Sequence, residues 1–340
     1  MDDGEQREIE DRLRRQIDAY HEAALLFAAV TSRVPDLLSQ APRAPEKLAS
    51  ELGLNSEALR RVLRGLVTMQ LCEELPDGRF ALTAAGESLT LDSPSSLREK
   101  AMVVLSQYWL PWLGLMHCLK TGQPSFPHVF GASVSDWRRT HAKEAKPFYH
   151  YLAKEEIAHA DDVLQSLPTL EAGSVVASIG GGYGGWLAPL LRGRPDLKGV
   201  VFDAGPVAEA AEPLFEAYGV ADRVSVVAGD ILEAIPVEAD IYVLKSVLQQ
   251  HDDADAGAVL ENCRKAMRPG VKLIVVERLM PDKATDDPAA IMLDLHMMAI
   301  TGGKTRTKPD MEALIAAAGL GVTAISKTYE GLAFIEIAAP

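Results

Sequence analysis

A glycine-rich turn directly after an apolar run is the feature that most constrains the fold of this chain. The run Ser174–Ile179 is typical of a β-strand, and it leads straight into Gly180-Gly-Gly-Tyr-Gly-Gly185. Five glycines in six residues would cost conformational entropy without return in an ordinary turn. A strand that turns at once into a helix, and a ligand that touches the main chain, both need residues without a Cβ. The spacing of these glycines by itself also fits a dinucleotide site, so the ligand stays open at this point.

Strand-like and helix-like segments alternate from residue 172 onward, which is typical of a parallel sheet with crossover helices. The expected strands span residues 174–179, 199–203, 223–227, 239–244 and 271–277, and a closing hairpin is expected at 321–327 and 331–337. The length of 340 residues favours two domains, and 48% apolar residues suffice for a core in each. This part of the chain is therefore predicted to be an α/β, Rossmann-like domain.

Acidic residues stand at the ends of two of these strands. Asp203 closes the second strand, 23 residues after Gly180, where a carboxylate can accept hydrogen bonds from both hydroxyls of a ribose. The third strand ends at Gly229-Asp230-Ile231, where Asp230 suits an adenine amino group and Ile231 suits the face of its ring. An Asx-turn or a helix cap is the alternative role for Asp230. Because parallel strands end at one edge of a sheet, we expect the three loops to enclose one nucleoside.

The N-terminal segment has a different pattern, with apolar residues at helical spacing and then a short hairpin. Gly53 suits a tight turn between two helices, and Asn55 or Ser56 suits the N-cap of the second helix. The hairpin strands are expected at 71–75 and 80–82. Together these elements predict a winged helix-turn-helix in a mainly helical domain.

Two functions are open to this unit. Arg60, Arg61 and Arg64 lie on its second helix, as they would in a DNA-binding protein. The formal net charge of −14 opposes binding to a polyanion, so we favour dimerisation and expect no nucleic-acid partner. A regulator that binds DNA and senses a metabolite through its second domain is the lesser alternative.

Composition argues against several other classes of protein. Cys72, Cys118 and Cys263 are far apart and odd in number, so neither a disulfide framework nor a metal cluster is expected. No apolar run approaches the length of a membrane span, and the acidic N-terminus differs from a signal peptide. We therefore expect a cytoplasmic protein that holds no metal.

Taken together, these motifs resemble the S-adenosylmethionine (SAM) dependent O-methyltransferases of the plant caffeate and bacterial antibiotic-biosynthesis type, over nearly the whole chain. The family's glycine motif matches Gly180–Gly184, with Ser178 in place of the usual preceding Asp. Its ribose-binding acid matches Asp203, and Lys245 matches a position near the methionyl carboxylate of SAM. The resemblance implies SAM rather than NAD as the cofactor. The implied cofactor residues are Gly180, Gly182, Gly184, Asp203, Gly229, Asp230, Ile231 and Lys245.

The resemblance also implies the domain order. Residues 1–97 would form a winged-helix domain that makes a homodimer, and 98–165 a helical linker that lines the substrate pocket. Residues 166–340 would form a class I methyltransferase domain with a seven-stranded mixed sheet. The implied substrate-binding residues are Phe148, His150, Leu152, His296 and Met297. Their aromatic and apolar character suits a flat small molecule.

The departures from the family's pattern fall on its catalytic positions. Gln249 stands where the family has its general-base His, and Thr305 stands where it has a supporting Glu. Of the three catalytic positions, only Glu277 keeps the family's residue. An amide is not a base, although the side-chain amide of Gln249 could hydrogen-bond an acceptor or a carbonyl. His251 and His296 are the candidates for a relocated base.

Three reactions are therefore open. The first is methyl transfer to an acceptor that is already nucleophilic, such as a carbon, an amine or an acidic phenol ionised beside the sulfonium. The second is O-methylation with His251 or His296 as the base. The third binds SAM without transferring methyl, as in relatives that hydroxylate or catalyse eliminations and pericyclic steps. We favour methyl transfer, foremost to oxygen, on a small aromatic or polyketide-like secondary metabolite, since nothing in the sequence marks the third.

Overall fold

A computed structural model describes residues 3–93, 95–327 and 331–338 of the chain. The chain divides into two compact units, Met1–Ser106 and Gln107–Pro340, and each is described by itself. Among the described residues, no helix combines the length and the apolar character that crossing a membrane requires.

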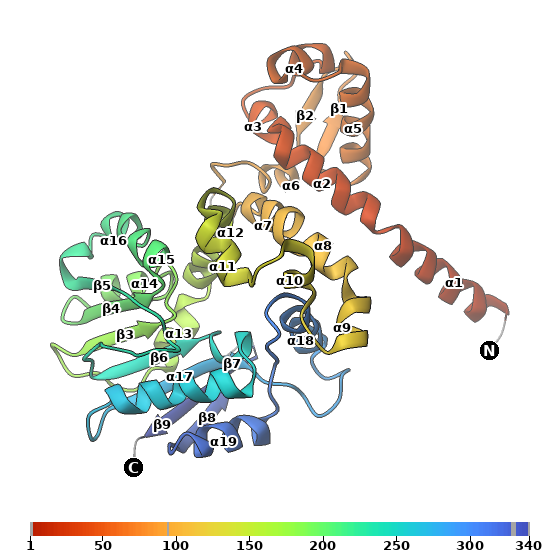
Figure 1. Cartoon of the computed structure of the whole chain (residues 1–340). Helices are drawn as coiled ribbons and strands as arrows, with labels where there is room; N and C mark the ends of the chain where they lie inside the picture. The colour runs from red at the N-terminus through yellow and green to blue at the C-terminus, as the bar shows by residue number, and fades with distance from the viewer. Residues whose placement is uncertain (1–2, 94, 328–330, 339–340) are drawn as a thin grey trace. The chain divides into compact units, whose positions relative to one another are not determined.

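The N-terminal unit is mainly helical and includes a two-stranded sheet (Figure 1). Its elements are α1 (Asp3–Asp18), α2 (Tyr20–Ser32), α3 (Val34–Leu38), α4 (Pro45–Leu52), α5 (Ser56–Thr68), β1 (Cys72–Glu74), β2 (Phe80–Leu82), α6 (Ala84–Glu87) and α7 (Arg98–Val103). Gly53 ends α4 in the left-handed conformation, with φ at 67°. Asn55, rather than Ser56, caps α5 by accepting a hydrogen bond from the Ala58 amide at 2.9 Å. The predicted helix-turn-helix and its antiparallel hairpin are confirmed.

The C-terminal unit begins with a run of short helices. After a π-helical turn, η1 (Val104–Tyr108), come α8 (Trp109–Leu113), α9 (Leu115–Thr121), α10 (Ser125–Phe130), α11 (Val134–Thr140), α12 (Ala142–Ala158) and α13 (Ala160–Ser166). Phe126 and Trp137 pack with Ile300 of the later helix α18 (Pro288–Ile300) in one apolar cluster. This cluster packs α10 and α11 against α18.

A seven-stranded mixed sheet organises the rest of this unit (Figure 1). Its strands are β3 (Val175–Ile179), β4 (Lys198–Asp203), β5 (Val224–Ala228), β6 (Ile241–Lys245), β7 (Lys272–Arg278), β8 (Gly321–Lys327) and β9 (Leu332–Ala338). Their order in space is β5-β4-β3-β6-β7-β9-β8, with β3 to β7 parallel and β9 antiparallel to both neighbours. The predicted α/β fold with a mixed sheet and a closing hairpin is confirmed.

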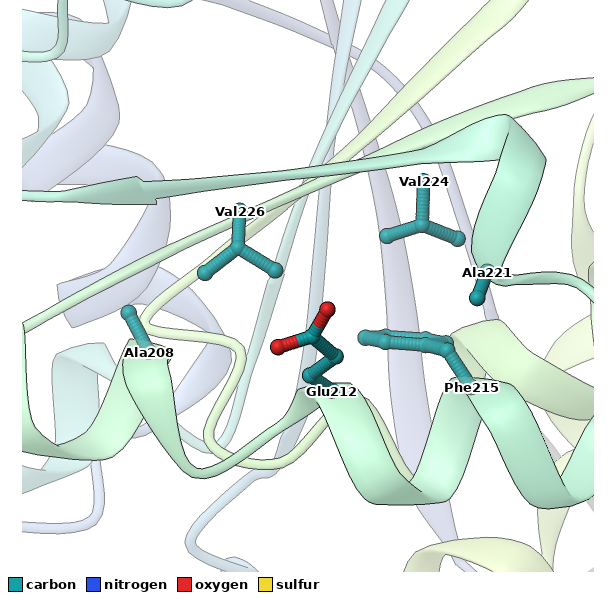
Figure 2. A pocket seen from close by; sticks show the side chains of 6 residues that line it. All are labelled: Ala208, Glu212, Phe215, Ala221, Val224 and Val226. Atoms are coloured by element: carbon teal, nitrogen blue, oxygen red, sulfur yellow. The ribbon is translucent and has the colours of Figure 1, made fainter.

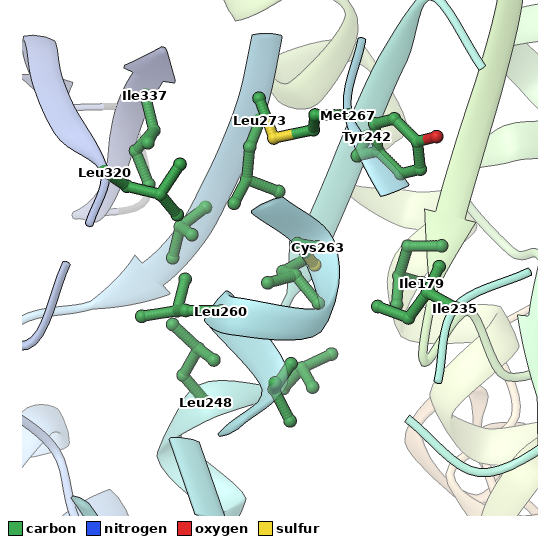
Figure 3. Packing of buried hydrophobic residues seen from close by; sticks show 14 of the residues in the cluster. Ile179, Ile235, Tyr242, Leu248, Leu260, Cys263, Met267, Leu273, Leu320 and Ile337 are labelled. Carbon is green, nitrogen blue, oxygen red and sulfur yellow. The ribbon is translucent and has the colours of Figure 1, made fainter. Parts of the chain in front are cut away.

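Helices cover both faces of this sheet, which explains why its strands are nearly continuous apolar runs. One face packs against α17 (Asp253–Ala266) and α19 (Lys308–Ala317), and Figure 3 shows Leu260 and Cys263 of α17 beside Tyr242 and Leu273 of the strands. The other face packs against α14 (Leu187–Gly193) and α16 (Glu212–Tyr218). The remaining short helix, α15 (Gly205–Glu209), follows β4.

The direction in which the sheet is built reverses between β3 and β6. The chain lays β4 and β5 outward on one side of β3, then returns to place β6 and β7 on the other side. Where the strand order reverses, adjacent loops leave the sheet toward opposite faces and open a crevice at the carboxyl ends of the strands. The fold therefore puts the most favourable ligand position beside the loops that the sequence marks.

Candidate active site

Three loops at the carboxyl edge of the sheet are joined by direct hydrogen bonds. The Gly182 amide donates to Asp203 Oδ2 at 2.8 Å, and the Gly229 amide donates to the Asp203 carbonyl at 3.0 Å. The Gly180 amide donates to the Phe202 carbonyl at 2.8 Å. The predicted convergence of the loops after β3, β4 and β5 is confirmed.

The glycines of the first loop serve different purposes. Gly180, Gly182 and Gly184 all have left-handed φ, at 62°, 56° and 76°. A Cβ at Gly184 would lie 2.3 Å from the Phe215 ring, and one at Gly180 would lie 2.8 Å from Val247. A Cβ at Gly182 would meet nothing within 4 Å. Packing thus demands two of the glycines, whereas Gly182 presents bare main chain to open space, as a bound cofactor requires.

The Asp203 carboxylate is half-buried and has acceptor capacity to spare. Oδ1 accepts from the Ala204 amide at 2.7 Å, and Oδ2 accepts from the Gly182 amide. Each carboxylate oxygen has two lone pairs, so one acceptor position on each remains for the two ribose hydroxyls. Burial raises the pKa of Asp203, and the two amide hydrogen bonds oppose that rise.

Asp230 and its neighbours form the third loop. Asp230 Oδ1 accepts from the Leu232 amide at 2.8 Å, so the Asx-turn considered above is present and occupies one carboxylate oxygen. A Cβ at Gly229 would lie 2.7 Å from the Phe202 ring, which explains the glycine there. The carbonyl of Ile231 accepts from Asn262 Nδ2 at 3.0 Å. The second Asp230 oxygen and the half-buried Ile231 side chain suit the adenine, and this assignment stays a prediction.

A buried ion pair lies beside the glycine loop. Lys245 Nζ at the end of β6 is 3.5 Å from Glu156 Oε1 of α12, and both side chains are mostly buried. α12 packs directly on the loop, because a Cβ at Gly185 would lie 2.8 Å from the Glu156 Cβ. Burial raises the pKa of Glu156, while Lys245 and the Gly185 amide hold it down. Ser178 brings no charge here, since its hydroxyl oxygen accepts from the Trp186 indole at 3.1 Å.

Two of the predicted catalytic residues are in contact. Gln249 lies on the segment after β6, and Glu277 lies on β7. The Gln249 amide donates to Glu277 Oε1 at 3.0 Å, and both residues are buried. Gln249 Oε1 and Thr305 Oγ1 are buried without a hydrogen-bond partner, a state reported for no other side-chain atom of the described residues. A buried polar atom without a partner costs about 1–3 kcal/mol, so each of these two atoms is a candidate contact for a polar group of a ligand.

Arg306 joins the loop of Thr305 to the loop of Gln249. Its guanidinium donates to the carbonyls of Leu248 and His251 and to the Asp253 carboxylate, at 2.9, 3.0 and 3.0 Å. The Thr305 amide in turn donates to an oxygen of Asp294 on α18 at 2.8 Å. The two unpartnered atoms therefore stand on loops that are locked together.

Burial raises the pKa of Glu277 to about 7, and the amides of Gln249, Leu248 and Val247, together with Arg306, oppose the rise. A carboxyl of this kind is close to half-protonated at neutral pH. The Glu277 carboxyl holds Gln249 in place by accepting a hydrogen bond from the Gln249 main-chain amide.

The two histidines considered as bases have different surroundings. His296 Nδ1 accepts from the Trp112 indole at 3.1 Å, and its ring meets the Tyr108 ring edge-on at 4.4 Å. The indole fixes the proton of the neutral ring on Nε2, and burial lowers the pKa of His296 to about 4. His296 is thus a hydrogen-bond donor at neutral pH. Burial also lowers the pKa of His251, against the charges of Asp255, Asp252 and Asp230.

The structure places the predicted substrate-binding residues in different surroundings. The Phe148 ring lies 3.3 Å below the guanidinium carbon of buried Arg138, and His150 meets the Tyr183 ring of the glycine loop at 5.6 Å. Met297 is buried, whereas Leu152 is 38% exposed. Phe148, His150 and His296 thus stay predictions with an aromatic setting, and Leu152 has less support from its surroundings.

Four residues that contact the predicted site residues were not themselves predicted from the sequence. Arg138, Glu156 and Tyr183 contact site residues from helices or loops where they look like surface positions, and Arg306 is 2% exposed despite its charge. Two of them carried a signal in the sequence, because Tyr183 lies within the glycine motif Gly180–Gly185 and Arg306 lies in the glycine-containing segment Thr301–Thr307. The others are placed by packing between distant segments.

A hollow of about 350 Å³ lies between β5 and the helices that follow β4 (Figure 2). It is lined by Ala208, Glu212, Phe215, Ala221, Val224 and Val226. None of these was predicted as a site residue. The hollow meets the cofactor loops through Phe215, whose ring backs Gly184.

Two family models match the chain. Residues 112–321 match the O-methyltransferase domain, and residues 15–92 match the O-methyltransferase dimerisation domain. Among curated proteins, the phenazine O-methyltransferase PhzM of Lysobacter antibioticus is 31% identical over 95% of this chain and 94% of its own length. The aclacinomycin 10-hydroxylase RdmB of Streptomyces purpurascens is 29% identical over 87% of this chain and 80% of its own length.

Solved structures show the same relationship. The crystal structure of LaPhzM covers 98% of this chain and 99% of its own, with a TM-score of 0.92 and 30% identity. The O-methyltransferase NcsB1 of neocarzinostatin biosynthesis, solved with SAM and 2-hydroxy-5-methyl naphthoic acid, has a TM-score of 0.81 and 29% identity. The alignment covers 94% of this chain and 96% of that one.

Replacing Asp203 by Ala removes both predicted ribose contacts. We expect the affinity for SAM and for its demethylated product to fall roughly 100-fold, because hydrogen bonds to a charged group are each worth about 1.5–3 kcal/mol. Titration calorimetry measures the change. Asp222→Ala, at an exposed carboxylate in the same domain, is the control. Unchanged affinity in Asp203→Ala would show that the ribose binds elsewhere.

The raised pKa of Glu277 predicts a dependence of stability on pH. Its protonated form favours the folded state, so this contribution is complete below pH 4.5 and is lost as the pH rises through about 7. The loss is on the order of 3 kcal/mol. Glu277→Gln keeps an oxygen for the Gln249 amide but has no proton to lose. Denaturant unfolding at pH 5 and pH 8 should show a smaller decrease for the variant, and equal decreases would contradict the prediction.

Proposed function

The chain belongs to the family of SAM-dependent O-methyltransferases with an N-terminal dimerisation domain, and from this premise we propose that it methylates a hydroxyl of a small aromatic or polyketide-like secondary metabolite. One observation carries the proposal. Gln249, whose Oε1 is buried without a hydrogen-bond partner, follows Lys245 at the end of β6 by four residues and so stands next to the loops that suit an adenosyl group. Cofactor and acceptor can therefore meet at the same sheet edge.

The order of the strands sets the direction of the cofactor. Adenine at the end of β5 and ribose at the end of β4 direct the methionine part across the β3 loop toward β6. Neighbouring strands lie about 4.8 Å apart, so three strand spacings span the length of an extended nucleoside with its side chain. The acceptor then approaches from the side of Gln249 and Glu277. SAM supplies an electrophilic methyl group, and the chain aligns an acceptor lone pair with it.

The unpartnered atoms suggest how the acceptor is held. Gln249 Oε1 needs a donor, which the acceptor's own O–H or N–H supplies. The Thr305 hydroxyl can donate to, or accept from, the same group or its ortho neighbour. The aromatic residues around His296 and Phe148 suit the aromatic ring that carries the acceptor hydroxyl. An amine acceptor satisfies the same contacts, so N-methylation remains within the proposal.

Neither Gln249 nor His296 is suited to remove a proton from the acceptor. Gln249 is an amide, His296 uses its Nδ1 lone pair for Trp112, and Glu277 Oε1 accepts from the main-chain amide of Gln249. A phenol has a pKa of about 10, and a cation close to it favours the ionised form. We propose that the acceptor ionises through its own acidity beside the sulfonium. This corresponds to the first of the three reactions considered from the sequence.

A second candidate is SAM-dependent chemistry without methyl transfer. The missing base and the likeness to a protein named as a hydroxylase favour it. Incubation with SAM and a panel of phenols, naphthoates and aminophenols separates the two. We expect product and S-adenosylhomocysteine in equal amounts. Product formed without S-adenosylhomocysteine would overturn methyl transfer and support the second candidate.

A gain of function tests the role of Gln249. With Gln249→His, we expect the methylation rate of a phenol of pKa about 10 to rise roughly tenfold at pH 7, because a base then contributes. A phenol of pKa below 7 should gain little. Gln250→His, at the exposed neighbouring residue, is the control. An equal loss of rate for both phenols in Gln249→His would contradict the proposal.

We propose that the protein is a cytoplasmic homodimer that does not bind nucleic acid. Two arginines of α5 are already neutralised, since Arg60 pairs with Glu46 at 2.6 Å and Arg64 pairs with Glu74 at 3.0 Å. Little positive charge remains on this helix for a phosphate backbone.

The assembly is open to direct measurement. Light scattering after gel filtration should give twice the chain mass of 36.7 kDa. Fluorescence anisotropy with labelled duplex DNA should show no binding at 50 mM salt. Binding at 50 mM salt that is lost at 200 mM would instead support the regulator.

A further inference from the structure

We propose that Glu156 binds the α-ammonium group of the cofactor, while Lys245 binds its α-carboxylate, so that the pair acts as a clamp for an amino-acid zwitterion. The inference rests on the proposed function, since it assumes SAM at this edge. It assigns to α12 a binding group that neither the glycine motif nor the strand ends contain.

The first argument is the position of the pair. The sheet order β5-β4-β3-β6 puts the ribose site and Lys245 on opposite sides of the β3 loop. Glu156 lies directly against that loop at Gly185 and within 3.5 Å of Lys245 Nζ. A ligand held by Asp203 at its ribose therefore reaches Glu156 and Lys245 with the far end of its side chain.

The second argument is the geometry of the ion pair. A well-made ammonium–carboxylate hydrogen bond measures about 2.7–2.9 Å, whereas Lys245 Nζ and Glu156 Oε1 are 3.5 Å apart. The side chains are only 12% and 18% exposed, so water compensates their charges poorly. A loose buried pair contributes little stability and costs desolvation. A zwitterion inserted beside it would give each charge a closer partner.

The third argument is charge balance. Near neutral pH, SAM carries a sulfonium, an ammonium and a carboxylate, for a net charge of +1. Asp203, Glu156 and Lys245 together carry −1 when ionised, so ligand and site neutralise each other. The sulfonium methyl group then lies between Asp203 and the pair, on the side of the acceptor.

The test compares two ligands by titration calorimetry on the full chain. S-adenosylhomocysteine contains the amino-acid end, and 5′-methylthioadenosine lacks it. In Glu156→Gln we expect the affinity for S-adenosylhomocysteine to fall roughly 10- to 100-fold and the affinity for 5′-methylthioadenosine to change less than about twofold. Glu155→Gln, the neighbouring residue on α12, is the matched control and should change neither.

Each outcome decides something. Equal weakening of both ligands would mean that Glu156 acts only on the shape of the glycine loop, and unchanged affinity for both would mean that it does not contact the cofactor. Either result overturns the clamp while leaving the proposed function intact. A wild-type protein that binds neither ligand overturns the proposed function itself. Should Glu156→Gln not fold, Glu156→Asp, which keeps the charge but shortens the side chain, should show a smaller loss that is again confined to S-adenosylhomocysteine.

Discussion

The carboxylate and the carbonyl of one residue, Asp203, hold together the edge of the sheet on which the rest of the site depends. Its Oδ2 accepts from Gly182 and its carbonyl accepts from Gly229, so the loops after three neighbouring strands share one anchor. The arrangement keeps Gly182 in a left-handed conformation with open space before it. It also keeps the Asp203 carboxylate away from bulk water, and this burial raises the pKa of Asp203. A ligand that donates hydrogen bonds from hydroxyl groups to this carboxylate offsets the free-energy cost of its desolvation.

The segment around Gln249, where we propose that the acceptor binds, is held by side chains rather than by the strand ends. Arg306 and Glu277 lock the segment around Gln249 from two sides, one through carbonyls and the other through amides. This rigid frame presents Gln249 Oε1 and Thr305 Oγ1, neither of which can remove a proton at neutral pH. On the proposed function, orientation of the acceptor rather than proton transfer is therefore the contribution of this frame. Enzymes obtain much of their acceleration from such positioning, so a missing base need not mean a missing reaction.

The N-terminal unit shows how charge decides between functions of one fold. A helix-turn-helix with three arginines has the outline of a DNA reader. Glu46 and Glu74 pair with two of those arginines, and the whole chain is strongly acidic. The fold is thus compatible with DNA, whereas this distribution of charge disfavours a polyanion, in keeping with the homodimer that we propose.

The sequence by itself determined the fold and the loops that meet at the carboxyl edge of the sheet, where we propose that the cofactor binds. The glycines, the apolar strands and Asp203 are local signals, because conformational freedom and the ends of parallel strands are properties of short segments. All seven strands of the large sheet formed within two residues of their expected bounds. Tertiary structure alone decided that Glu156 lies against Gly185 and that the Trp112 indole donates to His296. It also decided that Gln249 Oε1 and Thr305 Oγ1 are buried without hydrogen-bond partners. These contacts join residues that are far apart in the chain. No periodicity records them, and each depends on how helices and loops pack once the sheet has formed.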